Sequence, residues 1–192
     1  MFKIPANLDM NVIEERIKTP LSDADLERYF GTGPESEVII YSDLANYNTI
    51  DELLPKELDY RIILVEFKPH QGHWVVVLKY NDTIEMFNSY GENVDKQKNG
   101  FVSRMMNIRL GQGQDYLTQL MKKSDAKYRL VYNKKKFQKV SPYINTCGRH
   151  CALRIICCEK MMMDLSEYTR FIDRNEKATG FDADTLVSIW IN

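Results

Sequence analysis

The sequence predicts an α+β fold, in which a mixed, mostly antiparallel central sheet is flanked by helices. Helical patterns lie near both ends of the chain and β-rich patterns lie in the middle, with no repeat or linker between them. Of the 192 residues, 44% are hydrophobic and 28% are charged, and the net charge is −1. Such a chain can bury its own core and has no strong overall field for nucleic acid. We therefore expect one domain over residues 1–192.

The first third of the chain predicts helices followed by strands. The segment 21–31 has a serine cap, acidic residues in its first turn and a glycine stop, so the first ~30 residues are expected to be helical. Residues 37–44 are rich in β-formers, residues 49–58 predict a helical turn, and residues 60–67 form an apolar run typical of a buried strand.

Residues 72–91 predict a β-hairpin whose loop is Asn81 and Asp82. With a two-residue loop, the residue numbers of each cross-strand pair add up to 163. His73 and Asn88 then share one face as diagonal neighbours, about 7–8 Å apart at the backbone, so their side chains can meet. An odd-length loop would place Asn88 on the opposite face.

The second half of the chain predicts mainly helices. Residues 92–111 are polar and predict a loop with one short helix. The other expected elements are a helix at 114–123, strands at 128–133 and 136–140, a long buried helix from Cys147 to Met163, and closing helices at 165–174 and 182–191.

The stretch "NTCGRHC" places Cys147 in the first turn of the long helix, behind Asn145 or Thr146 as the cap. Unpaired backbone N–H groups at this position are expected to lower the pKa of the thiol toward neutrality. Gly148 is expected to leave the space beside the sulfur open for a substrate backbone. Cys147 is therefore a candidate nucleophile.

The other candidate ligands and bases predict structural roles. Cys151, Cys157 and Cys158 lie deeper in the same helix and suit a buried core, as reduced thiols in a reducing, intracellular compartment. His70 and His150 are expected to be structural or surface residues. A zinc site is disfavoured because one helix can direct only about two ligands at one ion and no second cluster completes the tetrahedron. We expect no metal, no cofactor and, without a long apolar run, no membrane segment.

Taken together, "GHW", "EMFNSYG" fifteen residues after the histidine and a glutamine before "TCG" resemble the adenain-like and SUMO-protease-like cysteine proteases. The resemblance covers about residues 37–165. It implies the fold of that family, with His73 as general base, Asn88 as its orienting partner, Cys147 as nucleophile and Gln138 as oxyanion donor. It also implies that Trp74 helps to wall a narrow substrate channel.

Two positions depart from the family pattern. Asn88 stands where many relatives carry aspartate, and it can hold the imidazole tautomer without stabilising imidazolium by charge. Gln138 lies nine residues before Cys147, a longer spacing than the family leads us to expect.

The resemblance is strongest to maturation proteases of double-stranded DNA viruses, including virophages. It implies a monomeric endopeptidase that acts on capsid or other virion precursors beside glycine or alanine, within the virion and the cytoplasmic virus factory. An accessory DNA or peptide activator is an open question, and the lysine-rich run 134–139 is expected to be a solvated face. The alternatives are a deubiquitinase or deSUMOylase, an acetyltransferase of related fold, and an inactive binding module.

Overall fold

The computed structural model describes residues 2–30 and 38–192, so the predicted glycine stop at Gly31 lies outside the described residues. A five-stranded sheet runs through the centre in the order β1-β2-β3-β4-β5. Its strands are β1 (Val38–Ile40), β2 (Asp59–Lys68), β3 (Gln71–Tyr80), β4 (Thr83–Phe87) and β5 (Arg129–Tyr132). The two central pairings are antiparallel, whereas β1 and β5 join parallel at the edges. The predicted α+β class, with a mixed sheet between helices, is confirmed.

The β3–β4 hairpin has the predicted register. Tyr80 pairs with Thr83 and Val76 pairs with Phe87, while Asn81 takes a positive φ of 49° in the loop. An asparagine tolerates this left-handed conformation better than most residues, so the Asn-Asp loop closes the hairpin without a glycine. The pairing ends at Val76, which leaves the first residues of β3 beyond the end of β4.

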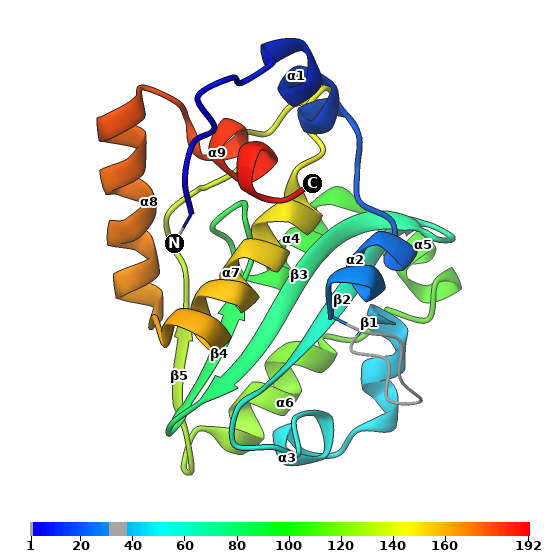
Figure 1. Ribbon diagram of the computed structural model, residues 1–192. Helices are drawn as coiled ribbons and strands as arrows, with labels where there is room; N and C mark the ends of the chain where they lie inside the picture. The colour runs from blue at the N-terminus through cyan, green and yellow to red at the C-terminus, as the bar shows by residue number, and fades with distance from the viewer. Residues whose placement is uncertain (1, 31–37) are drawn as a thin grey trace.

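One face of the sheet is covered by the long helix α7 (Cys147–Met161), which crosses it in Figure 1. Trp74, Val76 and Leu78 of β3 project into this core and pack with the apolar side of α7. Around α7 lie α1 (Met10–Lys18), α2 (Asp23–Phe30), α8 (Leu165–Thr179) and α9 (Ala183–Trp190). The alternation of β3 thus sends every second side chain toward the helix that begins at Cys147.

The opposite face carries a second core. Val75 and Val77 of β3 pack there with Ile63 of β2 and with residues from short helices. These helices are η1 (Tyr41–Asn46), α3 (Ile50–Leu53), α4 (Val94–Phe101) and α6 (Tyr116–Ser124). The short helix α5 (Arg104–Arg109) lies between α4 and α6 in the chain. The sheet is therefore buried on both faces, which explains why β2 and β3 are apolar along most of their length.

A buried ion pair links α7 to the hairpin. The Arg154 guanidinium donates to both carboxylate oxygens of Glu85 at 2.7 and 2.6 Å, and both side chains are fully buried. Tyr80 adds a hydroxyl hydrogen bond to the same carboxylate. This bidentate geometry sets the position of α7 along β4, because both charges need each other when they are removed from water.

One sequence prediction is confirmed only in part, and another is wrong. In the segment 92–111 the expected short helix is α5, but α4 takes the place of loop; Asn93 and Ser103 cap these two helices through side chains that accept from Lys96 N and Met106 N. The strand expected at 136–140 is absent; the backbone N–H groups of Phe137 and Gln138 both donate to Ser89 O. These contacts tie the segment to the end of β4 instead of to a strand edge.

Candidate functional site

His73 lies near the start of β3, at the place where β2 and β3 approach closely. A Cβ at the preceding residue, Gly72, would lie 2.0 Å from Val65 O, so only glycine permits this approach. The ladder is irregular between Glu66 and Lys68, and the connecting His70 has a positive φ of 59°. The bulge and the glycine together fix where His73 enters the sheet.

His73 and Asn88 meet as the hairpin register predicts. His73 Nε2 lies 2.9 Å from Asn88 Oδ1, and both side chains are buried. The amide Nδ2 of Asn88 donates to Glu92 O and Gln97 Oε1, which fixes its oxygen toward the histidine. An amide oxygen only accepts, so Nε2 carries the proton and Nδ1 keeps its lone pair. His73 is thus held as the tautomer that can act as a base through Nδ1.

Asn88 is itself held by residues that the sequence did not single out. Its backbone N–H donates to Asn133 Oδ1 at 2.9 Å, and Asn133 Nδ2 donates back to Asn88 O at 2.6 Å. Asn88 Oδ1 also accepts from Tyr90 N at 3.0 Å, forming an Asx-type turn after β4. Of these positions, only the Asn-Ser-Tyr-Gly turn signal was visible in the sequence; Gln97 and Asn133, which follow Asn88 by 9 and 45 residues, carried no signal.

Tyr90 connects the histidine to the cysteine. Its ring stacks on His73 with a centroid distance of 4.4 Å and an interplanar angle of 11°. Burial raises the pKa of Tyr90 to about 12, and negative charge on Cys147 and Asp184 adds to that rise. The phenol therefore lies within electrostatic reach of Cys147 while its ring restrains the imidazole plane.

Cys147 is the first residue of α7, after Thr146 as N-cap. The Thr146 hydroxyl makes no capping bond; it donates to Asp184 Oδ1 at 2.5 Å, and Asn145 Nδ2 donates to Lys18 O at 2.7 Å. The backbone N–H groups of Trp74, Gly148 and Cys147 favour the thiolate form and so act to lower the pKa of this thiol. Since Trp74 follows His73 directly, the start of α7 sits against β3 beside the histidine.

The protonation states differ from the prediction of a thiolate. Burial raises the pKa of the Cys147 thiol, and the opposing effect of the three N–H groups does not overcome it. Burial also lowers the pKa of His73 to about 4, helped by the nearby His150 and opposed by the Asn88 hydrogen bond. At neutral pH the two groups are therefore a neutral thiol and a neutral imidazole.

The space beside Gly148 is filled, contrary to the prediction that it is open. A Cβ at Gly148 would lie 3.1 Å from Leu21 Cβ and 3.2 Å from Trp74 Cδ1. The Trp74 indole N–H donates to Leu21 O at 2.9 Å, and Arg149 Nη1 donates to Thr19 O at 2.6 Å. The chain between α1 and α2 is thus fastened over the start of α7, which leaves Cys147 only 7% exposed.

Gln138 lies in the segment that leads into α7. Its Oε1 accepts from the Ser89 hydroxyl at 2.7 Å, and its Nε2 donates to Ile144 O at 3.2 Å. The side chain is buried between the turn after Asn88 and the turn before Cys147. The amide nitrogen carries two protons, and the bond to Ile144 O uses one of them.

The remaining histidines and cysteines have structural positions, as expected. His150 is buried on α7 with Nε2 at 3.1 Å from Asp184 Oδ1, and His70 lies exposed in the β2–β3 connection. The four cysteines are buried and free of disulfides. Within the described parts of the chain, no group of three or more His, Cys, Asp or Glu side chains could hold a metal ion.

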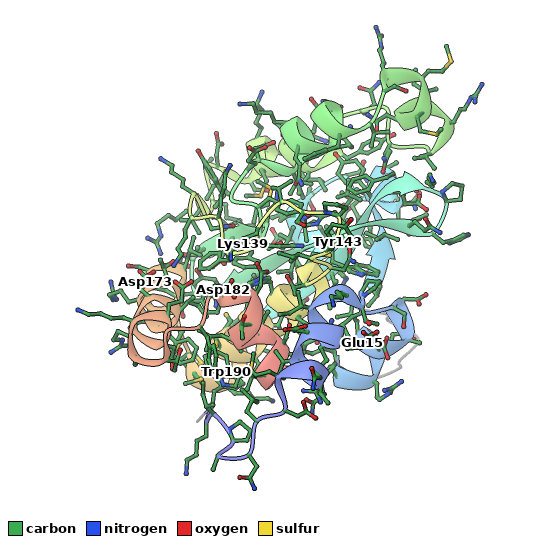
Figure 2. The ribbon with its side chains drawn as sticks, turned by 90° about the horizontal axis from the view of Figure 1, so that it is seen from above. Glu15, Lys139, Tyr143, Asp173, Asp182 and Trp190 are labelled. Carbon is green, nitrogen blue, oxygen red and sulfur yellow. The ribbon has the colours of Figure 1, made fainter. Side chains whose placement is uncertain are left out.

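The lysine-rich run is partly neutralised. Lys139 Nζ donates to Asp182 Oδ2 at 2.6 Å, and Lys135 pairs with Asp173 and Glu176 of α8. Figure 2 shows Lys139 near Asp182 at the surface where this segment passes the start of α9, with Tyr143 further along the same segment. The run is thus a salt-bridged face, in keeping with the sequence prediction of a solvated one.

Comparison with known proteins gives one relative and no family model. No protein-family model matches the chain. Across residues 2–30 and 38–192, no helix is long and apolar enough to cross a membrane. Over 157 aligned residues the chain is 33% identical to protein V9 of the Sputnik virophage, described as uncharacterized, and the alignment covers 81% of this chain and 85% of V9. The chain therefore belongs to the family of virophage proteins that includes Sputnik V9.

Proposed function

We propose that this protein is a cysteine endopeptidase with Cys147 as nucleophile, His73 as base, Asn88 as orienting residue and Gln138 as oxyanion donor. The observation that supports the proposal is the fixed tautomer of His73. Its Nε2–H is held 2.9 Å from Asn88 Oδ1, and Nδ1 is left as the basic atom. A partner that orients the imidazole and fixes its tautomer is what a histidine general base needs.

The reaction starts from neutral groups. As the sulfur of Cys147 attacks a peptide carbonyl carbon, its proton passes to His73 Nδ1, and the C–O double bond opens to an oxyanion. The Cys147 N–H and one Gln138 N–H would hold that oxyanion. When the C–N bond breaks, His73 returns its proton to the leaving amine nitrogen, which leaves a thioester on Cys147.

Water completes the cycle. His73 Nδ1 takes a proton from the water molecule that attacks the thioester carbonyl, and the collapse of the second tetrahedral species breaks the C–S bond. The thiolate sulfur recovers the proton from His73, and the acid product leaves. The reaction draws on no organic cofactor, and each proton is returned within one turnover.

The substrates proposed are capsid or other virion precursors, cut beside glycine or alanine, in the virion or the cytoplasmic virus factory. Membership in a virophage family supports this context, and a maturation protease such as that of mavirus is the finer proposal. The enzyme is proposed to act as a monomer. An accessory activator, either DNA or a peptide, is part of the same proposal.

The test is cleavage by the purified full chain. Wild type and Cys147→Ala are incubated separately with a virophage capsid precursor and with ubiquitin-like fusion proteins, with and without DNA, and new N-termini are identified by mass spectrometry. Cys151→Ala, which removes a neighbouring thiol of the same helix, is the matched control. Cleavage of the precursor by wild type and Cys151→Ala, and none by Cys147→Ala, is expected. Cutting confined to the fusions would replace the viral substrate with ubiquitin-like ones, and cleavage by Cys147→Ala would remove the nucleophile assignment.

A second candidate is a protease-like binding module. Two observations favour it: the pKa of the Cys147 thiol is raised by burial, and Leu21 fills the space beside Gly148. Such a protein would bind a precursor chain without cutting it. Equal binding of the precursor by wild type and Cys147→Ala, together with no new N-termini in any condition, would identify this function.

A further inference from the structure

A groove near the start of α7 lies where β1 and the β2–β3 connection meet the chain between α1 and α2. It has a volume of about 880 Å³ and reaches Trp74 and Asn145, which flank the position of Cys147. One wall is the chain from Pro20 to Asp23 with Glu27 of α2, and the other is the β2–β3 connection around His70 and Gly72. The groove therefore reaches residues close to the proposed catalytic site, although its described lining does not include Cys147 or His73.

The groove has an apolar floor and an acidic border. Ile39, Ile40, Leu64 and Phe67 lie along it, and Phe67 is 38% exposed. Three of its described lining residues are acidic, Asp23, Glu27 and Asp43, and none is lysine or arginine. An extended peptide has side chains on alternate sides, so it can place an apolar side chain on the floor and a charged one at the border.

The charges at the border are held in place. Asp43 accepts from Ile40 N through Oδ2 at 3.2 Å, and Asp23 accepts from Ala24 N through Oδ1 at 2.9 Å. Each of these hydrogen bonds occupies one oxygen of the aspartate carboxylate and not the other. Carboxylates positioned in this way attract a cationic side chain and repel nucleic acid, so the groove suits a polypeptide.

We propose that this groove selects protein substrates that carry a lysine or arginine next to an apolar residue, within a few residues of the bond that is cut. The proposal rests on the proposed function, because the groove acts on the chain that Cys147 cleaves. It adds a basic requirement to the small residues expected at the cut.

The experiment maps cleavage sites in a peptide library. Proteins are first cut at acidic residues, so that lysine and arginine stay inside the peptides, and the library is then incubated with each variant of the full chain at low salt. Sites are accepted only when wild type produces them and Cys147→Ala does not. The double variant Asp23→Asn/Asp43→Asn tests the groove, and Glu57→Gln/Asp125→Asn removes the same charge from exposed positions outside it.

At wild-type sites, lysine and arginine should occur at least about twice as often on one side of the cut as in the library, and the charge control should match wild type. The Asp23→Asn/Asp43→Asn variant should lose that enrichment, and on a synthetic peptide of the best site its KM should rise about 5- to 10-fold, less at high salt. Mapped sites without basic enrichment, or enrichment that the double variant keeps, would overturn the groove proposal and leave the protease. If no site depends on Cys147, the proposed function is overturned, and the groove proposal with it.

Discussion

Two buried histidines of this protein have similar partners and different surroundings. His73 on β3 is held through Nε2 by a neutral amide, and His150 on α7 is held through Nε2 by the carboxylate of Asp184. Nδ1 of His150 is buried with no hydrogen-bond partner, whereas His73 lies near the start of β3, one residue before Trp74, which packs against Gly148. Asp184 also accepts from the Thr146 hydroxyl and from Lys139 N, so it joins three segments of the chain.

The difference shows what separates a base from a structural histidine. Through Asp184, His150 belongs to a hydrogen-bond network that holds α9, α7 and the segment before α7 together. Asn88, in contrast, is held from both sides and serves mainly to orient His73. Loss of His73 is thus expected to affect chemistry, and loss of His150 is expected to affect folding.

The largest expected effect is that of His73→Ala on cleavage. Removing the base at Nδ1 should lower kcat/KM by about 10³- to 10⁴-fold, because proton transfer in the transition state then falls to water. Kinetics on a mapped peptide check this against the melting temperature of the same variant. An activity within tenfold of wild type would mean that His73 and His150 do not differ in the way proposed.

The second effect belongs to His150→Ala. The change removes a hydrogen bond to buried Asp184 and opens a cavity in the core, so it should lower the free energy of unfolding by about 2–4 kcal/mol. Urea denaturation measures it. Activity at a temperature where the variant is folded should stay within about tenfold of wild type, and a thousandfold loss there would assign His150 a part in catalysis.

The third prediction concerns stability against pH. The pKa of His73 is lowered to about 4 in the folded protein, from an ordinary 6.5. Between these values the unfolded chain binds one more proton, so folding stability should fall as pH drops from about 6.5 to 4, by up to roughly 3 kcal/mol. Unfolding curves of wild type and His73→Gln over this range test it. Equal slopes in the two proteins would contradict the lowered pKa.

The smallest expected effect is a shift in a pH profile. Asn88→Asp places a carboxylate next to Nε2 of His73 and should raise the histidine pKa, so the acid limb of kcat/KM should move up by about 1 unit. The variant should also be less stable. In wild type, Glu92 O and Gln97 Oε1 accept hydrogen bonds from Asn88 Nδ2, whereas a carboxylate oxygen at that place cannot donate to them. Asn88→Ala is the control without charge. An unmoved limb would show that position 88 does not influence the base.

The local patterns of the sequence predicted the hairpin, the pairing of His73 with Asn88 and the start of α7 at Cys147. These features depend on neighbours in the chain: the two-residue loop sets the register, and period-two alternation sets the face. The strand expected at 136–140 does not form, because the backbone N–H groups of Phe137 and Gln138 donate to Ser89 O, nearly fifty residues away in the chain. Of the two helices in 92–111, α4 was missed because its polar pattern carries weak periodicity, whereas α5 lies where one short helix was expected.

By itself, the sequence determined the α+β class and the hairpin register, and its resemblance to adenain-like proteases pointed to the four residues proposed for catalysis. Only the tertiary structure decided how those residues are protonated, since burial raises the thiol pKa and lowers that of His73. It also decided that Leu21 covers Gly148 and that Asn133 and Gln97 hold Asn88. Register follows from local geometry, whereas desolvation and packing depend on segments that meet only in the folded chain.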